Sequence, residues 1–468
     1  MKTFAQIAIA VAMLSFGTYA SVQINNHVAF NGYEKLYLLP LLYMFLFIFI
    51  LNPLLFSRFN TFLMTYSAVS FLRYMMLPFL IVKSGWYIGR SPVNPLSSSF
   101  ELAIELMLWE LLLVTLAVGL FFGRKKVLRL KMNETKKVAL PESYTVYIAY
   151  ILISIVVLAL APEVLNSFAF IMPHDNMIDI GAAGFKTSIA QFVLITAKYI
   201  LFLLMMTAIY RQYEKAPSFL WIFISFLIVL LNICILFGDN RSDFLISAIA
   251  SLYLFYRLYV KRALPFIIGT TVLLFIVFMN ITTYRNTVTI TNGVDRLVDV
   301  TDTLQIYAGG PYNVAMATEL SQYFPYAATA GNFLYDLARP FIGLNIFLRD
   351  VDGFQFSNYL FNYRIYFDDH VAQILPMVGQ GYFYSGFLFA PFLDIVFVAI
   401  AYMLYRIMMK GNRIELIFFL SIPITRIGFM MGQNGGILLN DISFTLLLNI
   451  LIYVANNYVV LKRREVAT

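Results

Sequence analysis

The stretch FGDNRSDF, residues 237–244, places two carboxylates and one guanidinium in a short turn between two apolar runs. A guanidinium is a planar fork of N–H donors that can bind phosphate through two hydrogen bonds. We therefore interpret Arg241 as a candidate phosphate ligand that Asp239 and Asp243 orient. A second interpretation is a self-contained charged turn in which Ser242 or Asp243 only caps the helix that follows.

Further arginines stand beside apolar runs or in the long segment that separates two of them: Arg285, Arg426, Arg339 and Arg364. Several guanidinium groups at one membrane surface suit a lipid-linked diphosphate, because its charge lies at the headgroup plane while its tail stays in lipid. We expect Arg241 and Arg285 to contact the diphosphate and Arg426 to support them. The alternative is that each arginine pairs with a nearby acid.

Three side chains are candidates for a general base: His370, Asp243 and Glu105, in falling order. Histidine titrates near neutrality, which suits proton transfer, but His370 beside Asp368 and Asp369 also reads as a surface residue. Glu101 and Glu105 are four residues apart and share one helical face. That face is either a solvated interfacial stripe or the wall of a polar cavity.

Four charges fall inside apolar runs, where charges are costly and either paired or functional. Arg73, Glu110, Lys198 and Asp394 each lie nine to twelve residues below the predicted outer end of their helix, about 15 Å at 1.5 Å per residue. The sequence predicts an Arg73–Glu110 pair between antiparallel neighbouring helices. The group is either a structural ion pair or the floor of a cavity in which Arg73 and Lys198 bind substrate.

The depths assigned to these charged residues assume that the chain spans a membrane, and the amino-acid composition indicates that it does. The chain has 468 residues, of which 61% are hydrophobic and 12% charged, whereas soluble domains are about 25% charged. Runs of ~20 apolar residues span a bilayer. We predict an all-α protein with twelve such runs: 4–22, 36–56, 61–82, 100–122, 143–161, 187–210, 217–237, 243–260, 264–283, 385–405, 414–431 and 437–459.

Lysine and arginine give the orientation, because they collect on the cytoplasmic side. Of 33 basic residues, 20 lie in the terminal segments and short connections on one side of the predicted spans. Seven of these 20 are in RKKVLRLKMNETKK, residues 124–137. Both termini are therefore expected in the cytoplasm, and residues 238–242 outside. The first 22 residues could also be a signal peptide, but a retained helix is the expectation. The basic balance is a topology signal and does not suggest nucleic acid.

The segment 284–384 separates the ninth and tenth spans and is expected outside. It holds five arginines, nine acids and eleven tyrosines. It is too aromatic for disorder, so we expect short helices on the outer face of the bundle. The chain then divides into 1–283, 284–384 and 385–468. Tyr382 is a candidate sugar contact, although most of these tyrosines fit an interfacial belt.

The sequence gives no reason to expect a metal or another cofactor. The three histidines, His27, His174 and His370, do not share a metal-ligand spacing, and no CxxC or EF-hand loop occurs. The one cysteine, Cys234, lies inside an apolar run and reads as a core residue.

The layout resembles the Wzy-type bacterial polysaccharide polymerases, which join O-antigen or capsule repeat units. Shared features are about twelve spans, both ends inside and one large late outer loop. GDNRSDF is similar to the short G-x-R-S-like turn of that family, and ILPMVGQGYFYSGFLFAPFLD, residues 374–394, resembles its small-aromatic-Gly stretch. Some members have an arginine followed by glycine eleven residues later in two outer loops, and none of the arginines discussed here shows that spacing.

The resemblance implies a GT-C-like fold in the bacterial inner membrane and a metal-independent glycosyltransferase. The substrate would be an undecaprenyl-diphosphate-linked oligosaccharide, which outer arginines hold while the growing chain passes to the next repeat unit. A chain-length regulator is a possible partner.

Two other classes fit parts of this pattern. A ligase would move a finished glycan from the same lipid to another acceptor. A secondary transporter or glycolipid flippase also fits twelve spans, although such proteins often join two six-helix halves by a long cytoplasmic loop. Here the longest loop is predicted outside and no repeat is evident.

Overall fold

A computed structural model describes residues 2–27, 30–57, 60–85, 87, 89, 91–123, 137–171, 185–237, 241–274, 296–348, 351–367 and 373–467. Within these ranges, eight helices are long and apolar enough to cross a membrane: Phe4–Asn26, Leu38–Ser57, Thr61–Ser84, Ser97–Phe122, Lys186–Lys215, Phe244–Leu274, Phe392–Gly411 and Gly435–Leu461. The chain is therefore a helical, multi-pass membrane protein. The predicted number of twelve spans is not confirmed.

The number of predicted spans differs from the number of membrane-length helices for local reasons. The predicted spans 143–161 and 217–237 coincide with the shorter apolar helices Thr145–Leu160 and Phe219–Cys234. The predicted spans 243–260 and 264–283 fall together on Phe244–Leu274, and the second continues beyond the described residues. The predicted span 414–431 contains α20, Ile414–Ile427, which carries Pro423 inside it and ends before the 3-10 turn η6, Met430–Gly432.

The chain divides into two compact units. The first unit contains residues 1–129, 293–403 and 426–443, and the second contains residues 130–292, 404–425 and 444–468. The boundaries of these units differ from those of the predicted division into 1–283, 284–384 and 385–468. The segment after the ninth predicted span thus belongs to the same compact unit as the first four spans.

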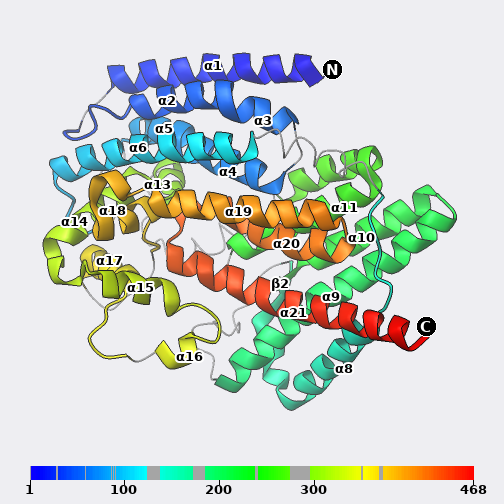
Figure 1. Cartoon of the computed structure of the whole chain (residues 1–468). Helices are drawn as coiled ribbons and strands as arrows, with labels where there is room; N and C mark the ends of the chain where they lie inside the picture. Colours follow the sequence, from blue (N-terminus) through cyan, green and yellow to red (C-terminus); the bar gives the residue numbers. More distant parts are fainter. Residues whose placement is uncertain are drawn as a thin grey trace. The chain divides into compact units, whose positions relative to one another are not determined.

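The first unit begins with α1 (Lys2–Asn26), α2 (Leu38–Leu46), α3 (Asn52–Ser57), α4 (Thr61–Phe71), α5 (Leu77–Ser84) and α6 (Ser97–Phe122). Figure 1 shows α1, α2 and α6 lying side by side, in blue and cyan. The side chain of Asn60 accepts a hydrogen bond from Phe62 N at 2.9 Å and so caps α4, as asparagine commonly does at helix starts.

Two of these spans contain a π-helical turn, and each turn precedes a proline. Segment η1 (Phe47–Leu51) lies before Pro53, and segment η2 (Leu72–Met76) lies before Pro78. A proline ring clashes with the carbonyl four residues earlier and donates no hydrogen bond. Hydrogen bonds to the fifth preceding residue, Asn52 N to Phe47 O and Leu77 N to Leu72 O, replace the regular pattern beside each proline.

The segment between the ninth and tenth predicted spans is largely helical where it is described, as expected. Its helices are α13 (Arg296–Ala308), α14 (Pro311–Tyr323), α15 (Ala330–Ala338), α16 (Asn345–Leu348), α17 (Ser357–Tyr366) and α18 (Met377–Phe389), with a 3-10 turn η5 (Pro325–Ala327). The expectation that they all lie on an outer face is wrong for α14, because every residue from Pro311 to Leu320 is buried. Helix α14 packs against α6, α17 and α18 inside the first unit.

The predicted span 385–405 is also corrected. Helix α18 runs from Met377 and kinks at Gly386, where φ is +74°, and α19 (Phe392–Gly411) is a separate helix. A residue with a side chain rarely adopts this backbone conformation, and glycine adopts it readily. The last helix, α21, runs from Gly435 to Ala467.

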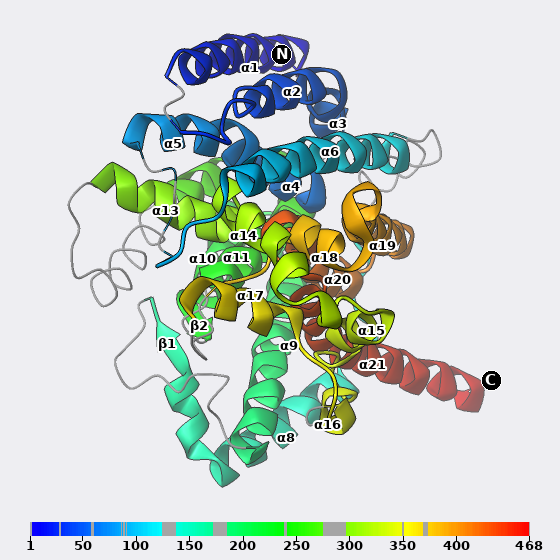
Figure 2. The same cartoon turned by 90° about the vertical axis from the view of Figure 1, so that its left-hand side faces the viewer.

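The second unit contains α8 (Thr145–Leu160), the 3-10 turn η3 (Pro162–Ser167), α9 (Phe185–Lys215), α10 (Phe219–Cys234), α11 (Arg241–Tyr259) and the 3-10 turn η4 (Val260–Ala263). It also contains a two-stranded antiparallel sheet, β1 (Phe168–Phe170) with β2 (Ile235–Phe237), which Figure 2 shows below α10. The predicted all-α class agrees with the structure, and one prediction is corrected here: the helix predicted for 217–237 ends at Cys234. Residues 235–237 are β-branched or bulky apolar residues, which favour strands.

Candidate functional site

The first unit contains a cavity of about 400 Å³, a size usual for small-ligand sites. It is lined by one cation, one amide and four aromatic rings: Arg339, Gln355, Tyr335, Phe354, Phe356 and Tyr359. We call this the Arg339 cavity. Its residues come from α15, from the extended stretch before α17 and from α17 itself, elements that lie next to one another in Figures 1 and 2.

One side of helix α15 carries residues that line the cavity and residues that support it. It starts at Ala330 because the side chain of Thr329 accepts a hydrogen bond from Asn332 N at 3.2 Å. Tyr335 and Arg339, four residues apart, line the cavity, and Asn332 and Asp336, also four apart, are buried beside them. Residues three and four positions apart share one side of a helix, so these four residues form one stripe of GNFLYDLARP, in which two members line the cavity and two anchor its wall.

Asn332 and Asp336 fix the opposite wall of the cavity. Asn332 Oδ1 accepts a hydrogen bond from Gln355 N at 3.1 Å, and Asp336 Oδ1 accepts one from Ser357 N at 2.9 Å. The two backbone N–H groups are two residues apart, as in an extended chain. The aromatic side chains of Phe354 and Phe356 are therefore placed by hydrogen bonds that do not use Tyr335 or Arg339.

Asp336 is the buried centre of this support. Its Oδ2 accepts hydrogen bonds from Tyr384 Oη at 2.8 Å and from Gln380 Nε2 at 3.3 Å. Burial raises the pKa of the Asp336 carboxyl, and hydrogen bonds from Ser357, Tyr384 and Gln380 oppose that rise. Burial and the charge of Asp336 also raise the pKa of Tyr384. Asp336 thus links three segments, and we treat it as a positioning residue.

Arg339 is held by rings. Its guanidinium carbon lies 5.3 Å from the ring centroid of Phe356 and 5.8 Å from that of Tyr335, within the range of cation–π attraction. Within the described parts of the chain, its guanidinium forms no hydrogen bond and no ion pair. Its donors are therefore available to an anion, while the rings offer faces on which a sugar can stack.

Three other arginines from the predicted site are buried against acids. Arg364 donates from Nε to Glu319 at 2.9 Å and also pairs with the same carboxylate through Nη2. Arg426 pairs with Asp441. Arg73 Nη2 lies 2.8 Å from Glu110 Oε2, and neither side chain is exposed. The predicted Arg73–Glu110 pair is confirmed, and this burial favours the interpretation as an ion pair over a cavity floor open to the outside.

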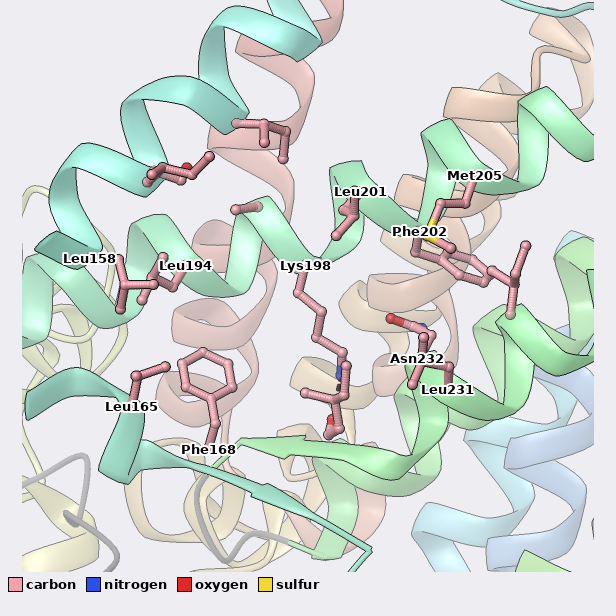
Figure 3. A pocket seen from close by; sticks show the side chains of 16 residues that line it. Leu158, Leu165, Phe168, Leu194, Lys198, Leu201, Phe202, Met205, Leu231 and Asn232 are labelled. Atoms are coloured by element: carbon pink, nitrogen blue, oxygen red, sulfur yellow. Dashed lines mark hydrogen bonds between the residues drawn. The ribbon is translucent and has the colours of Figure 1, made fainter. Parts of the chain in front are cut away.

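Lys198 lies in a different place, in the second unit. It extends from α9 into an apolar pocket of about 390 Å³, between Phe168 and Asn232 (Figure 3). Its Nζ donates to Ile235 O of β2 at 2.6 Å. The ammonium group therefore also secures the end of α10 where the helix changes to a strand.

The two remaining described candidates lie on α6 and α18. Glu101 and Glu105 both bind Lys35, at 2.8 and 2.6 Å, which confirms their common face. Glu105 also lines an apolar groove of about 490 Å³ that includes Phe45 and Trp109. Tyr382 on α18 is half-buried.

The remaining candidates cannot be placed against this cavity. Arg241 is the first residue of α11, but the side chains of Arg241 and Asp243 lie outside the described part of the structure, as do residues Asp239, Arg285 and His370. Their roles stay predictions.

Sequence reasoning missed most of the support for the Arg339 cavity. Asp336, Asn332 and Gln380 were not singled out, although the spacing of 332, 335, 336 and 339 carried a usable signal. Comparison of the chain with known proteins gave no match among family models, curated proteins or solved structures.

Proposed function

We propose that the protein is a membrane glycosyltransferase that joins lipid-diphosphate-linked oligosaccharide repeat units on the outer face of the bacterial inner membrane. The observation that carries this proposal is the Arg339 cavity: a guanidinium without an acidic partner among the described residues, set among aromatic rings. That combination suits a ligand with both sugar rings and a phosphate charge. A helical multi-pass protein with a long helical segment between two spans agrees with the same proposal.

In the proposed reaction, a hydroxyl oxygen of the acceptor sugar attacks the anomeric carbon of the donor chain. The bond from that carbon to the diphosphate breaks, the lipid diphosphate leaves, and the hydroxyl proton passes to a base. Preorganised cations lower the barrier by stabilising the charge that develops on the leaving group. We assign that role to Arg339. The roles of Arg241 and Arg285 as diphosphate contacts, and of His370, Asp243 and Glu105 as candidates for the base, stay separate predictions from the sequence.

The test compares Arg339→Ala and Arg339→Lys with the exposed Arg406→Ala as a matched control. We expect Arg339→Ala to lower transfer by about 10²–10³-fold, the cost of losing one preorganised charge contact, and to leave surface glycan with a single repeat unit. Arg339→Lys should recover little, because an ammonium cannot form the bidentate contact. Gel electrophoresis of the surface glycan, with the membrane level of each variant, gives the result.

A normal glycan ladder in Arg339→Ala at normal protein level would remove Arg339 from the site. Loss of all surface glycan, instead of loss of length, would favour the ligase or the transporter over a polymerase. Arg406→Ala should leave the ladder unchanged.

A further inference from the structure

Three charged side chains are buried inside the first unit and act on one another electrostatically, each from a different membrane helix. Arg73 comes from η2, Glu110 from α6 and Asp394 from α19, and all three are completely buried. Asp394 interacts electrostatically with both Glu110 and Arg73. We call these residues the buried triad.

The hydrogen bonds of the triad are unevenly distributed. Arg73 Nη1 donates to Met431 O at 2.5 Å, and Glu110 Oε2 accepts from Tyr74 Oη at 2.8 Å besides pairing with Arg73. Among the described residues, Glu110 Oε1 and both carboxylate oxygens of Asp394 have no hydrogen-bond partner. The triad thus satisfies the Glu110 carboxylate in part, whereas the Asp394 carboxylate interacts with its own backbone N–H and with the charges of the other two residues.

The charges of the triad do not balance. Arg73 neutralises one carboxylate, so ionisation of both acids would leave a net negative charge in a site without water access. An unpaired buried charge is expensive, and such a group takes up a proton instead of staying ionised. Two carboxylates in one apolar site commonly differ in this way, with one of them protonated.

The surrounding elements supply no second cation within the described residues. Besides the triad, the titratable groups that act on Asp394 or its partners are the hydroxyls of Tyr66 on α4 and Tyr74 on η2. Helix α13 packs against η2 and η6 and brings Asp302, whose charge acts on Tyr312. Each of these groups is neutral or acidic, so none can compensate a second carboxylate.

We propose that Arg73, Glu110 and Asp394 form a proton-binding site in the membrane, with the bound proton on Asp394. With the proton bound, Arg73 pairs with Glu110 alone, and α19 contributes a neutral carboxylic acid. When the proton leaves, Asp394 competes with Glu110 for the same guanidinium. The site therefore couples protonation to the contact between α19 and the helices that carry Arg73 and Glu110, independently of the Arg339 cavity.

Infrared spectroscopy of the full-length protein in lipid nanodiscs at neutral pH tests whether Asp394 is protonated. A protonated carboxylic acid gives a carbonyl band that a carboxylate does not give. Wild type should show the band, and aspartate labelled with a heavy carbon isotope should shift it. Asp394→Asn should remove one carboxylic acid from the spectrum. Glu110→Gln should retain the band, and so should Asp352→Asn, which changes an exposed acid as a control.

Two results would overturn the proposal. Loss of the band in Glu110→Gln but not in Asp394→Asn would put the proton on the wrong acid. If no band in the wild-type spectrum responds to labelled aspartate, Asp394 is ionised. Stabilisation of the wild-type protein by added Na⁺ or K⁺ would then identify a cation site. If Asp394→Asn fails to fold, the isotope shift measured in Asp336→Asn, which removes another buried aspartate with a raised pKa, and the Glu110→Gln spectrum decide the question.

Discussion

At the scale of single residues, burial decides what an arginine can do. Arg364 and Arg426 were candidates for phosphate binding, yet each is buried against an acid, Glu319 or Asp441. A buried guanidinium without such an acid would be strongly destabilising. Arg339 avoids that cost because it is only partly buried and rests on rings, so its charge remains available to a ligand.

The burial of Asp336 predicts how the stability of the protein depends on pH. Its pKa is raised by burial from an ordinary value of 3.8, so the folded protein binds this proton at a pH where the unfolded chain has released it. The free energy of unfolding should therefore fall as pH rises through the window between the two values, by at most about 1.4 kcal/mol per pH unit. Above the raised pKa this contribution becomes constant.

Asp336→Asn should remove this dependence, because an amide does not titrate. Thermal midpoints of wild type and variant over a pH series measure the difference, with Asp352→Asn as the exposed control. Parallel curves for wild type and Asp336→Asn would show that this carboxyl does not hold a proton in the folded state.

At the scale of elements, close helix contacts and interrupted helices shape the first unit. The π-helical turn η2 carries Arg73 at the point where Pro78 prevents regular hydrogen bonding, and such turns often occur at functional sites. Helices α14 and α18 approach closely because glycine stands at the contact: a Cβ atom on Gly379 would lie 2.4 Å from the Cβ of Ala317. Helix α18 also carries Gln380 and Tyr384, which hold Asp336.

Gly379→Ala should therefore separate α18 from α14 and destabilise the protein by about 1–3 kcal/mol, the usual cost of overpacking. Gly269→Ala is the matched control, because no atom lies within 4 Å of its added Cβ and alanine is about 0.5–1 kcal/mol better than glycine inside a helix. Denaturant or thermal unfolding in detergent compares the two. Equal stability of both variants would contradict the close contact.

At the scale of the whole molecule, the chain builds two compact units from non-consecutive pieces. The segment between the ninth and tenth predicted spans is part of the first unit, where α14 packs against α6 and the Arg339 cavity forms on α15 and α17. The segment that carries the candidate site is therefore built into a helical unit of the membrane protein. The positive-inside pattern predicts that this segment lies outside the cytoplasm, and the prediction is testable.

Cysteine labelling tests the orientation, because Cys234 is the one natural cysteine. In a Cys234→Ser background, Asp352→Cys should react with a membrane-impermeant maleimide added to intact cells, and Lys215→Cys should react only after the membrane is opened. Both positions are exposed, so accessibility within the protein does not differ between them. The reverse labelling would place the Arg339 cavity in the cytoplasm and exclude the proposed outer-face reaction.

The sequence by itself determined the membrane class, most helix positions and one ion pair, Arg73–Glu110. These features depend on local hydrophobicity and on neighbouring helices, which a linear pattern records. Only the tertiary structure decided which of the other arginines are paired. Glu319 lies 45 residues before Arg364, and Asp394 interacts electrostatically with Arg73 from a helix that is far away in the sequence. The sequence does not distinguish an arginine that pairs with an acid from one that has no acidic partner. Burial and pairing arise only when separate segments fold together.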